Sequence, residues 1–149
     1  MITVAIPADK FHHFQEAVDA YLERLPDVKL VKLPICKTQD PARAVREETK
    51  AAADWLAKKK EFTVFLHETG KKYSSRDFTA KLQGWRASRG NVRFLIGGSY
   101  GFDRAALVGL VDEAFSLGDV TLPHALATVV LLEQIYRAGQ ISKGTGYHH

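Results

Sequence analysis

Segments typical of strands alternate with segments typical of helices along the whole chain, and this alternation limits the possible folds more than any other feature. Strands that are separated by helices are joined by crossover connections, which favour a mainly parallel sheet. We therefore predict a single α/β domain with helices flanking a mainly parallel sheet. The strand-like segments are Ile2–Ile6, Val28–Leu33, Thr63–Leu66, Val92–Ile96 and Ala114–Leu117.

Between these strands, the chain has the apolar spacing and the capping residues of helices. Asp40 is typical of an N-cap, Pro41 of a first helical position, and Gly90 of a helix end. Ser74 or Ser75 is expected to cap the helix that Gly90 ends. The predicted helices are Phe11–Leu25, Ala42–Lys59, the segment from the Ser74-Ser75 pair to about Ser88, Arg104–Leu110 and Pro123–Ala138.

The composition is that of an ordinary globular protein. A chain of 149 residues can bury one hydrophobic core, so residues 1–149 are expected to form one domain.

No apolar run is long enough to span a bilayer and the N-terminus is typical of a strand, so a cytoplasmic protein is expected. The single Cys36 forms no disulfide within the chain, and no zinc-ligand spacing is present, so no metal is expected. The net charge of +4 permits RNA binding without demonstrating it.

Three predicted strands end in loops that are candidates for a binding site. In a parallel sheet, ligands bind outside the carboxyl ends of the strands, which here are Leu66–Gly70, Gly97–Gly98 and Leu117–Asp119. Glycines in such loops let backbone N–H and C=O groups approach a flat or anionic ligand. The run Gly97–Gly101 has neither the P-loop lysine nor the spacing of a dinucleotide fingerprint, so a plain tight turn is an alternative. A branched side chain at Gly98 is expected to block a site built this way.

The polar residues near these loops fit group transfer better than hydrolysis. No Ser/His/Asp order with a nucleophile elbow is present, and Glu113 and Glu133 suit structural roles as well as chemistry. His124 is interpreted either as a capping or core residue or as a catalytic one, and the role of His67 stays open. A site made mainly of backbone loops suits an enzyme whose cofactor carries the reactive atom.

The segment Pro123–Ala138 predicts a helix that is apolar on almost every side. It has apolar residues such as Leu126, Val130 and Ile135, with few charges before Arg137. Such a helix is either buried in the core or half-buried in a subunit interface, and both alternatives stay open. It is too short for a membrane span.

Several segments, most of them in the C-terminal half, match a known pattern in sequence and spacing. The matching segments are Phe94–Gly98, Ser116–Leu117, Thr121–His124, Glu133–Ala138 and Tyr147–His148, with a looser match at Leu66, Gly70–Lys71 and Ser74–Ser75. With these segments, nearly the whole chain resembles the ribosomal large-subunit methyltransferase H family, a small branch of the SPOUT methyltransferases.

The resemblance implies a fold, a cofactor and a substrate. The C-terminal segment would be threaded as a trefoil knot, and the enzyme would be a homodimer. The cofactor would be S-adenosylmethionine, and the substrate would be a pseudouridine in large-subunit rRNA, methylated at ring N3 on the assembled ribosome. By position, the cofactor contacts would be Leu66, Gly97, Gly98, Leu117, Gly118, Asp119, Val120, Thr121 and Leu122.

The terminal residues and three basic residues are the candidates for substrate contacts. Tyr147 could stack on the target base and His148 could accept the N3 proton, while a tail that only orients the substrate is the alternative. The resemblance implies that the tail of one subunit reaches the pocket of the other. Phosphate contacts are expected from Arg104, Arg137 and Lys143.

The sequence departs from the family pattern at a few positions whose roles stay open. Pro7–Lys10 replaces a Gly-Lys turn, His67 replaces a common Asp, and Thr128 replaces a common Arg. Gly118–Val120 replaces a stretch with serine, and His149 replaces a common Lys or Arg. Two alternative functions are a non-catalytic ribosome- or RNA-binding module of the same fold and a SPOUT methyltransferase that acts on tRNA.

Overall fold

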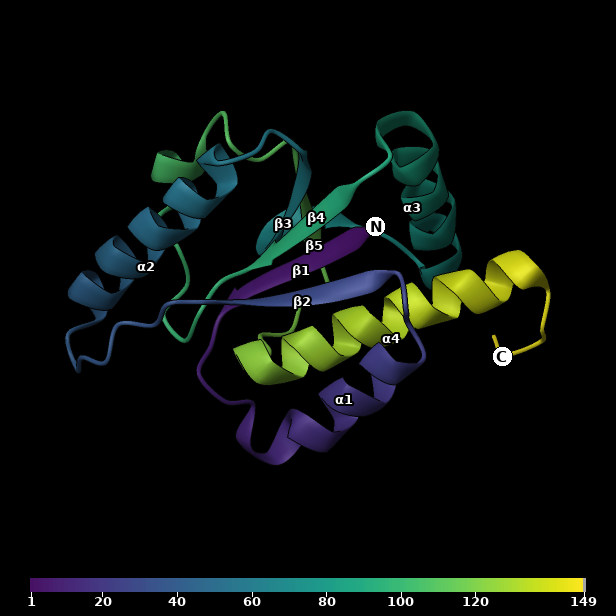
Figure 1. Cartoon of the computed structure of the whole chain (residues 1–149), viewed down its shortest axis with the longest axis horizontal. Coiled ribbons are helices and arrows are strands. Elements are labelled where there is room, and N and C mark those ends of the chain that lie inside the picture. Colours follow the sequence, from purple (N-terminus) through teal and green to yellow (C-terminus); the bar gives the residue numbers. More distant parts are fainter. Residues whose placement is uncertain (149) are drawn as a thin grey trace.

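A five-stranded sheet forms the centre of the computed structural model, which describes residues 1–148 (Figure 1). The strand order is β2-β1-β4-β3-β5, and every pair of neighbours is parallel. The predicted α/β fold class is confirmed, whereas the threading of the C-terminal segment as a knot stays a prediction. The strands are β1 (Ile2–Pro7), β2 (Val28–Leu33), β3 (Phe62–Lys72), β4 (Val92–Ile96) and β5 (Glu113–Ser116).

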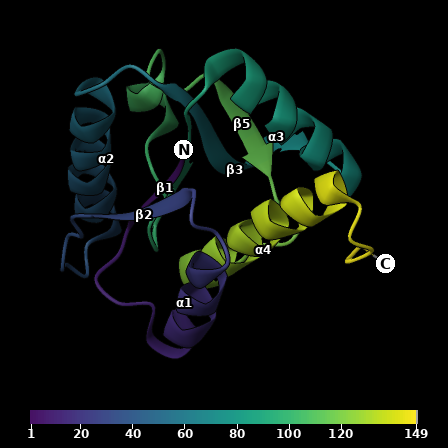
Figure 2. The ribbon, with the colours of Figure 1, turned by 45° about the vertical axis from the view of Figure 1, so that its right-hand side comes forward.

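Helices cover both faces of the sheet, and α2 lies on the opposite side from α1, α3 and α4 (Figure 2). Phe94 and Leu95 are neighbours in β4 and point to opposite faces, as successive strand residues do. Phe94 belongs to the same buried cluster as Leu131 of α4, and Leu95 belongs to the same buried cluster as Leu56 of α2. The helices are α1 (Gln15–Glu23), α2 (Pro41–Ala57), α3 (Ser75–Arg89) and α4 (His124–Lys143), with short 3-10 helices η1 (His12–Phe14) and η2 (Arg104–Leu107).

The helix boundaries follow the capping residues that the sequence indicates. The Asp40 carboxylate accepts the Ala42 N–H at 3.1 Å at the start of α2. The Ser74 hydroxyl oxygen accepts the Asp77 N–H at 3.0 Å at the start of α3. Gly90 follows α3 with a φ of 74°, a conformation that costs glycine little. These three predicted caps are confirmed.

Two elements are longer than the sequence pattern predicts. The predicted strand Thr63–Leu66 continues to Lys72, because the chain leaves the ladder after Leu66 and rejoins β5 at Lys71. The last helix continues past Ala138 to Lys143, because nothing breaks it before Gly144, which has a φ of 64°. No helix within residues 1–148 is long and apolar enough to cross a membrane.

Two predicted helices are shorter than expected. The segment Phe11–Leu25 opens with η1 and becomes α-helical only at Gln15, since His12 has a φ of 47° that an α-helix does not allow. The segment Arg104–Leu110 contains only the short η2.

Gly70 marks the point where β3 approaches β5 most closely. A Cβ atom at this position would lie 2.6 Å from the Phe115 nitrogen and 2.7 Å from the Ala114 carbonyl carbon. Both are backbone atoms of a sheet strand, so neither can move aside without disturbing the ladder. Only glycine fits between the two strands here.

We expect Gly70→Ala to lower the free energy of unfolding by about 1–3 kcal/mol, because the added methyl group overpacks the contact with β5. Gly84→Ala is the matched control, since Gly84 lies in α3 with no atom within 4 Å of its Cβ position. The control should raise stability by about 0.5–1 kcal/mol. Urea unfolding at one fixed protein concentration measures both, and a Gly70→Ala protein as stable as wild type would contradict the close approach.

Candidate cofactor site and the cavity beside it

A cavity of about 400 Å³ lies at the carboxyl edge of the sheet, beside the neighbouring strands β4, β3 and β5. Two of its walls are the loops that follow β4 and β5, and the third is the part of β3 after Leu66, where the β3–β4 ladder ends and β3 leaves its pairing with β5. The sheet order thus brings together residues from three distant parts of the sequence. The sequence-predicted contacts that line the cavity are Leu66, Gly97, Gly98, Leu117, Gly118, Val120, Thr121 and Leu122.

Asp119 is the one predicted cofactor contact that does not line the cavity. Its side chain is 85% exposed and forms an ion pair with Lys72 Nζ at the end of β3. The Asp119 side chain is therefore directed to solvent and Lys72, while its contact with the cofactor stays a prediction. The ion pair instead links the loop after β5 to the neighbouring strand.

The wall of the cavity carries no lysine or arginine side chain among the described residues. Its charged or titratable groups include Glu68, His67 and His124. Burial lowers the pKa of both histidines below the ordinary value, and the nearby Arg104 lowers that of His67 further. Both imidazoles are therefore neutral near pH 7, and the wall holds no fixed positive charge.

A small hydrogen-bond network holds the segment of β3 after Leu66 at the rim of the cavity. The His67 ring accepts the Thr69 N–H at Nδ1 over 3.2 Å, and Nδ1 also lies 2.9 Å from Thr69 Oγ1. Arg104 Nη1 donates to Thr69 Oγ1 at 2.5 Å. Among the three basic residues predicted to contact RNA, Arg104 is the one beside this cavity.

The backbone at Gly98 separates the cavity from a second space. A Cβ atom there would overlap with Glu48 Oε1 and come within 3.4 Å of Pro7 Cβ, and neither residue lines the first cavity. The expectation that a branched side chain at Gly98 blocks the cofactor cavity stays a prediction, since the Cβ position shows only the first contact of such a side chain. Such a side chain would first displace the Glu48 carboxylate.

The predicted catalytic tail lies at the opposite end of α4 from the cavity. Arg137 Nη2 pairs with Glu133 at 2.6 Å, and its guanidinium lies 4.9 Å from the centroid of the Tyr147 ring. Arg137 Nη1 also lies 3.2 Å from His148 Nδ1. His124 lines the cavity, and Arg137 follows about 20 Å further along the helix at 1.5 Å per residue. Within one chain, the tail and the cavity do not meet, and Figure 1 shows the chain after α4 turning back beside the last turns of that helix.

The structure also shows where Lys143 and Thr128 lie on α4, while the RNA contacts of Arg137 and Lys143 stay predictions. Lys143 ends the helix beyond Arg137, so these two basic residues are not near the cavity within one chain. Thr128, which stands where the family often has Arg, is fully buried and donates to the His124 carbonyl at 2.9 Å. Its hydroxyl is used inside the helix and is not offered to a ligand. His149 lies outside the described residues.

A second cavity of about 440 Å³ adjoins the first at the carboxyl ends of β1 and β2. Its wall includes the segment Pro7–Lys10 and the Glu48 side chain, and it shares Ser99, Tyr100 and His124 with the first cavity. Pro7–Lys10, the departure from the family turn, therefore forms part of a cavity wall. Within residues 1–148, no group of three or more His, Cys, Asp or Glu side chains is arranged to hold a metal ion.

Glu48 is the polar residue that the sequence reasoning missed. It is 8% exposed and lies on the buried side of α2, between Ala44 and Ala52 at a spacing of four residues. That spacing was readable in the sequence, because a glutamate interrupts an otherwise small and apolar stripe of a predicted helix. The consequence, that its carboxylate reaches the end of β4 at Gly98, depends on the sheet order.

Comparison with known proteins identifies the family. A family model described as Predicted SPOUT methyltransferase matches residues 1–148. Relatives named Ribosomal RNA large subunit methyltransferase H include a Solidesulfovibrio magneticus protein, which is 38% identical over 98% of this chain and 96% of the relative. A Prochlorococcus marinus protein of the same name is 32% identical over 97% of this chain and 92% of the relative.

A solved structure supports the fold. A Legionella pneumophila protein, solved in complex with the bound cofactor SAM, superposes with a TM-score of 0.58 at 16% identity. The match covers 93% of this chain but 66% of the Legionella chain, which is the longer of the two. Together with the cavity at the ends of β3, β4 and β5, the comparisons establish that the chain belongs to the SPOUT methyltransferases, in the ribosomal RNA large subunit methyltransferase H family.

Proposed function

We propose that the protein transfers the methyl group of S-adenosylmethionine to N3 of a pseudouridine in large-subunit rRNA, and that it acts as a homodimer on the assembled ribosome. The observation that carries this proposal is the cavity at the ends of β3, β4 and β5, which is lined by the segments that match the family. The names of the curated relatives support large-subunit rRNA as the class of substrate.

The cavity suits S-adenosylmethionine by its size and by its charge. Its volume of about 400 Å³ is within the range of small-molecule sites. A wall without lysine or arginine suits a ligand that carries a positive sulfonium, because like charges repel strongly where water is excluded. The glycine loop offers backbone N–H and C=O groups to a flat base, with apolar side chains such as Leu66 and Leu117 beside it. When bound, this cofactor supplies an electrophilic methyl group.

The position of the tail supports a dimer. Helix α4 has the cavity at its N-terminal end and the tail at its C-terminal end. In a two-fold contact in which α4 packs antiparallel on its own copy, the tail of one subunit lies beside the cavity of the other. Leu126 and Val130 are only half-buried within one chain and are therefore available to such a contact.

In this arrangement, Tyr147 and His148 of one subunit would contact the base at the other subunit's cavity. N3 must lose its proton as it takes the methyl group. A guanidinium donates hydrogen bonds and cannot accept them, so His148 Nδ1 is the acceptor from Arg137 and the neutral ring holds its proton on Nε2. A ring in this state can donate from Nε2 but cannot take a proton there. This geometry favours an orienting role for His148 over that of general base.

The same dimer would gather the predicted phosphate contacts around one RNA site. Arg104 lies at the rim of the cavity, and the other subunit would bring Arg137 and Lys143. Arg137 is already paired with Glu133, so we expect Arg104 and Lys143 to contribute more to phosphate binding and to its dependence on salt.

The function is tested by methyl transfer from labelled S-adenosylmethionine to ribosomes that lack the modification, with tRNA in parallel. We expect one labelled product on the ribosomes, mapped to N3 of a pseudouridine in large-subunit rRNA. Labelled tRNA with unlabelled ribosomes would support the tRNA methyltransferase alternative. No transfer to either RNA by a protein that folds would support a non-catalytic binding module.

The dimer is tested by Val130→Glu on the half-buried face of α4. Placing an unpaired carboxylate in an apolar interface costs several kcal/mol, roughly, so the variant should sediment as a monomer while the wild type sediments as a dimer. Ala87→Glu on the exposed face of α3 is the control and should stay dimeric. A wild-type protein that sediments as a monomer at micromolar concentration would contradict the proposed interface.

A further inference from the structure

The second cavity, at the ends of β1 and β2, adjoins the cofactor cavity. Ser99, Tyr100 and His124 line both cavities, and Ser99 Oγ lies 3.4 Å from His124 Nδ1. The volume of about 440 Å³ is large enough for a nucleotide. A base held there would lie beside a methyl donor in the first cavity without sharing its space.

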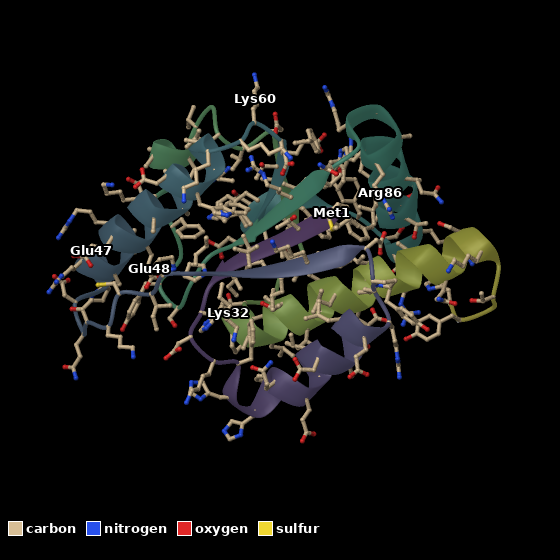
Figure 3. The ribbon with its side chains drawn as sticks, in the orientation of Figure 1. Met1, Lys32, Glu47, Glu48, Lys60 and Arg86 are labelled. Atoms are coloured by element: carbon tan, nitrogen blue, oxygen red, sulfur yellow. The ribbon has the colours of Figure 1, made fainter. Side chains whose placement is uncertain are left out.

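Glu48 supplies a buried carboxylate to this second cavity. Its Oε2 accepts the Cys36 N–H at 3.0 Å, and its Oε1 faces Gly98. Among residues 1–148, Glu48 has no ion-pair partner, and Oε1 has no hydrogen-bond donor. Figure 3 shows Glu48 on the side of α2 that faces the ends of β1 and β2, with Glu47 on the outer side of the helix.

The Glu48 side chain is only 8% exposed, yet Oε1 is not among the fully buried atoms without a partner, a class to which Tyr73 Oη alone belongs in the described residues. Oε1 is therefore reached from the cavity, where a ligand with an N–H donor can bind to it. The cations at the rim limit the class of ligand. Lys37 is paired with Asp9 at 3.6 Å across the opening, whereas Lys10 has no ion-pair partner among the described residues. The ligand should therefore place an N–H donor inside the cavity and an anionic group at its rim. A nucleotide has both features, in the ring N–H groups of its base and in its phosphate.

Pseudouridine has one ring N–H more than uridine. Its base is joined to the ribose through carbon, so both N1 and N3 carry hydrogen, whereas N1 of uridine forms the glycosidic bond. When N3 is the atom that takes the methyl group, N1–H remains as a donor that uridine lacks. A site built to accept a hydrogen bond from an N–H discriminates strongly against an analogue without it, because its buried acceptor is then left unpaired.

We propose that the second cavity holds the acceptor base and that Glu48 Oε1 accepts a hydrogen bond from its N1–H, which makes Glu48 the residue that selects pseudouridine over uridine. This inference rests on the proposed function. It assigns the acceptor side of the reaction to the loops after β1 and β2, and it leaves the part of β3 after Leu66 and the loops after β4 and β5 to the cofactor.

The test is Glu48→Gln, with Glu47→Gln as the matched control on the exposed side of the same helix. A carboxylate accepts hydrogen bonds on both oxygens, but an amide accepts on one only. The Cys36 N–H and the base N–H both need an acceptor, but the glutamine has only one amide oxygen. It must therefore turn its NH₂ group, which is a donor, toward one of these two donors. Methyl transfer is measured on ribosomes that carry pseudouridine at the target and on ribosomes that carry uridine there.

We expect the wild type and Glu47→Gln to prefer pseudouridine. Glu48→Gln should lose about 10- to 100-fold in kcat/KM on pseudouridine, the loss expected for a hydrogen bond to a charged group, and little on uridine. The ratio of kcat/KM on pseudouridine to kcat/KM on uridine should therefore fall sharply. The Kd for S-adenosylmethionine should stay within about twofold of the wild type, a change far smaller than tenfold. A merely structural role would not move the ratio.

The other outcomes overturn the inference. Equal losses on both RNAs would make Glu48 structural, and weakened cofactor binding with an unchanged ratio would assign the second cavity to the amino-acid tail of the cofactor. If Glu48→Gln does not fold, wild-type protein is compared on whole ribosomes that carry pseudouridine or N1-methylpseudouridine at the target, and equal rates would contradict the proposal. A wild type that methylates neither RNA would overturn the proposed function and this inference together.

Discussion

All five strands run parallel, and this one constraint creates every cavity described above. Parallel strands end at the same edge of the sheet, so loops that are far apart in the sequence meet there. The buried Arg93 helps to fix this arrangement, because it lies on β4 and donates to Thr63 Oγ1 on β3 at 3.0 Å and to the Leu56 carbonyl of α2 at 3.4 Å. The order of the strands then decides which loops share a cavity. Neighbours β4, β3 and β5 enclose the proposed cofactor site, and the ends of β1 and β2 enclose the space beside it.

Helix α4 separates the functional groups that the family resemblance would combine. Its first residue, His124, belongs to the cavity wall, whereas Tyr147 and His148 fold against its last turns through Arg137. One chain therefore holds a donor cavity and a tail that cannot meet. In the proposed dimer, a site composed of two subunits would resolve this separation and would also give the half-buried apolar side chains of α4 a partner. The small size of the chain would then be compatible with RNA recognition, since each subunit would supply part of the substrate surface to the other.

The strand exits could be predicted because alternating segments imply a parallel sheet, and Leu66, Gly98 and Leu117 lie at those exits. The direction of individual side chains could not be predicted from the sequence. Asp119 and Val120 are adjacent in sequence, yet only Val120 lines the cavity. The return of β3 to β5 at Lys71 was also hidden, because it depends on a close approach at Gly70 and not on a repeating pattern. Glu48 stood out of its helical stripe, but its role required knowing that α2 packs beside Gly98.

The central claim, that the cavity at the ends of β3, β4 and β5 holds a cationic methyl donor, is tested most directly by adding a charge to it. Leu117→Lys places an ammonium in a wall that has no lysine or arginine, and Leu117→Met is the neutral control. Calorimetry should give a Kd for S-adenosylmethionine that rises about tenfold more than that for neutral S-adenosylhomocysteine, which is about 1.4 kcal/mol of extra repulsion. Equal changes for both ligands, or none for either, would contradict the account.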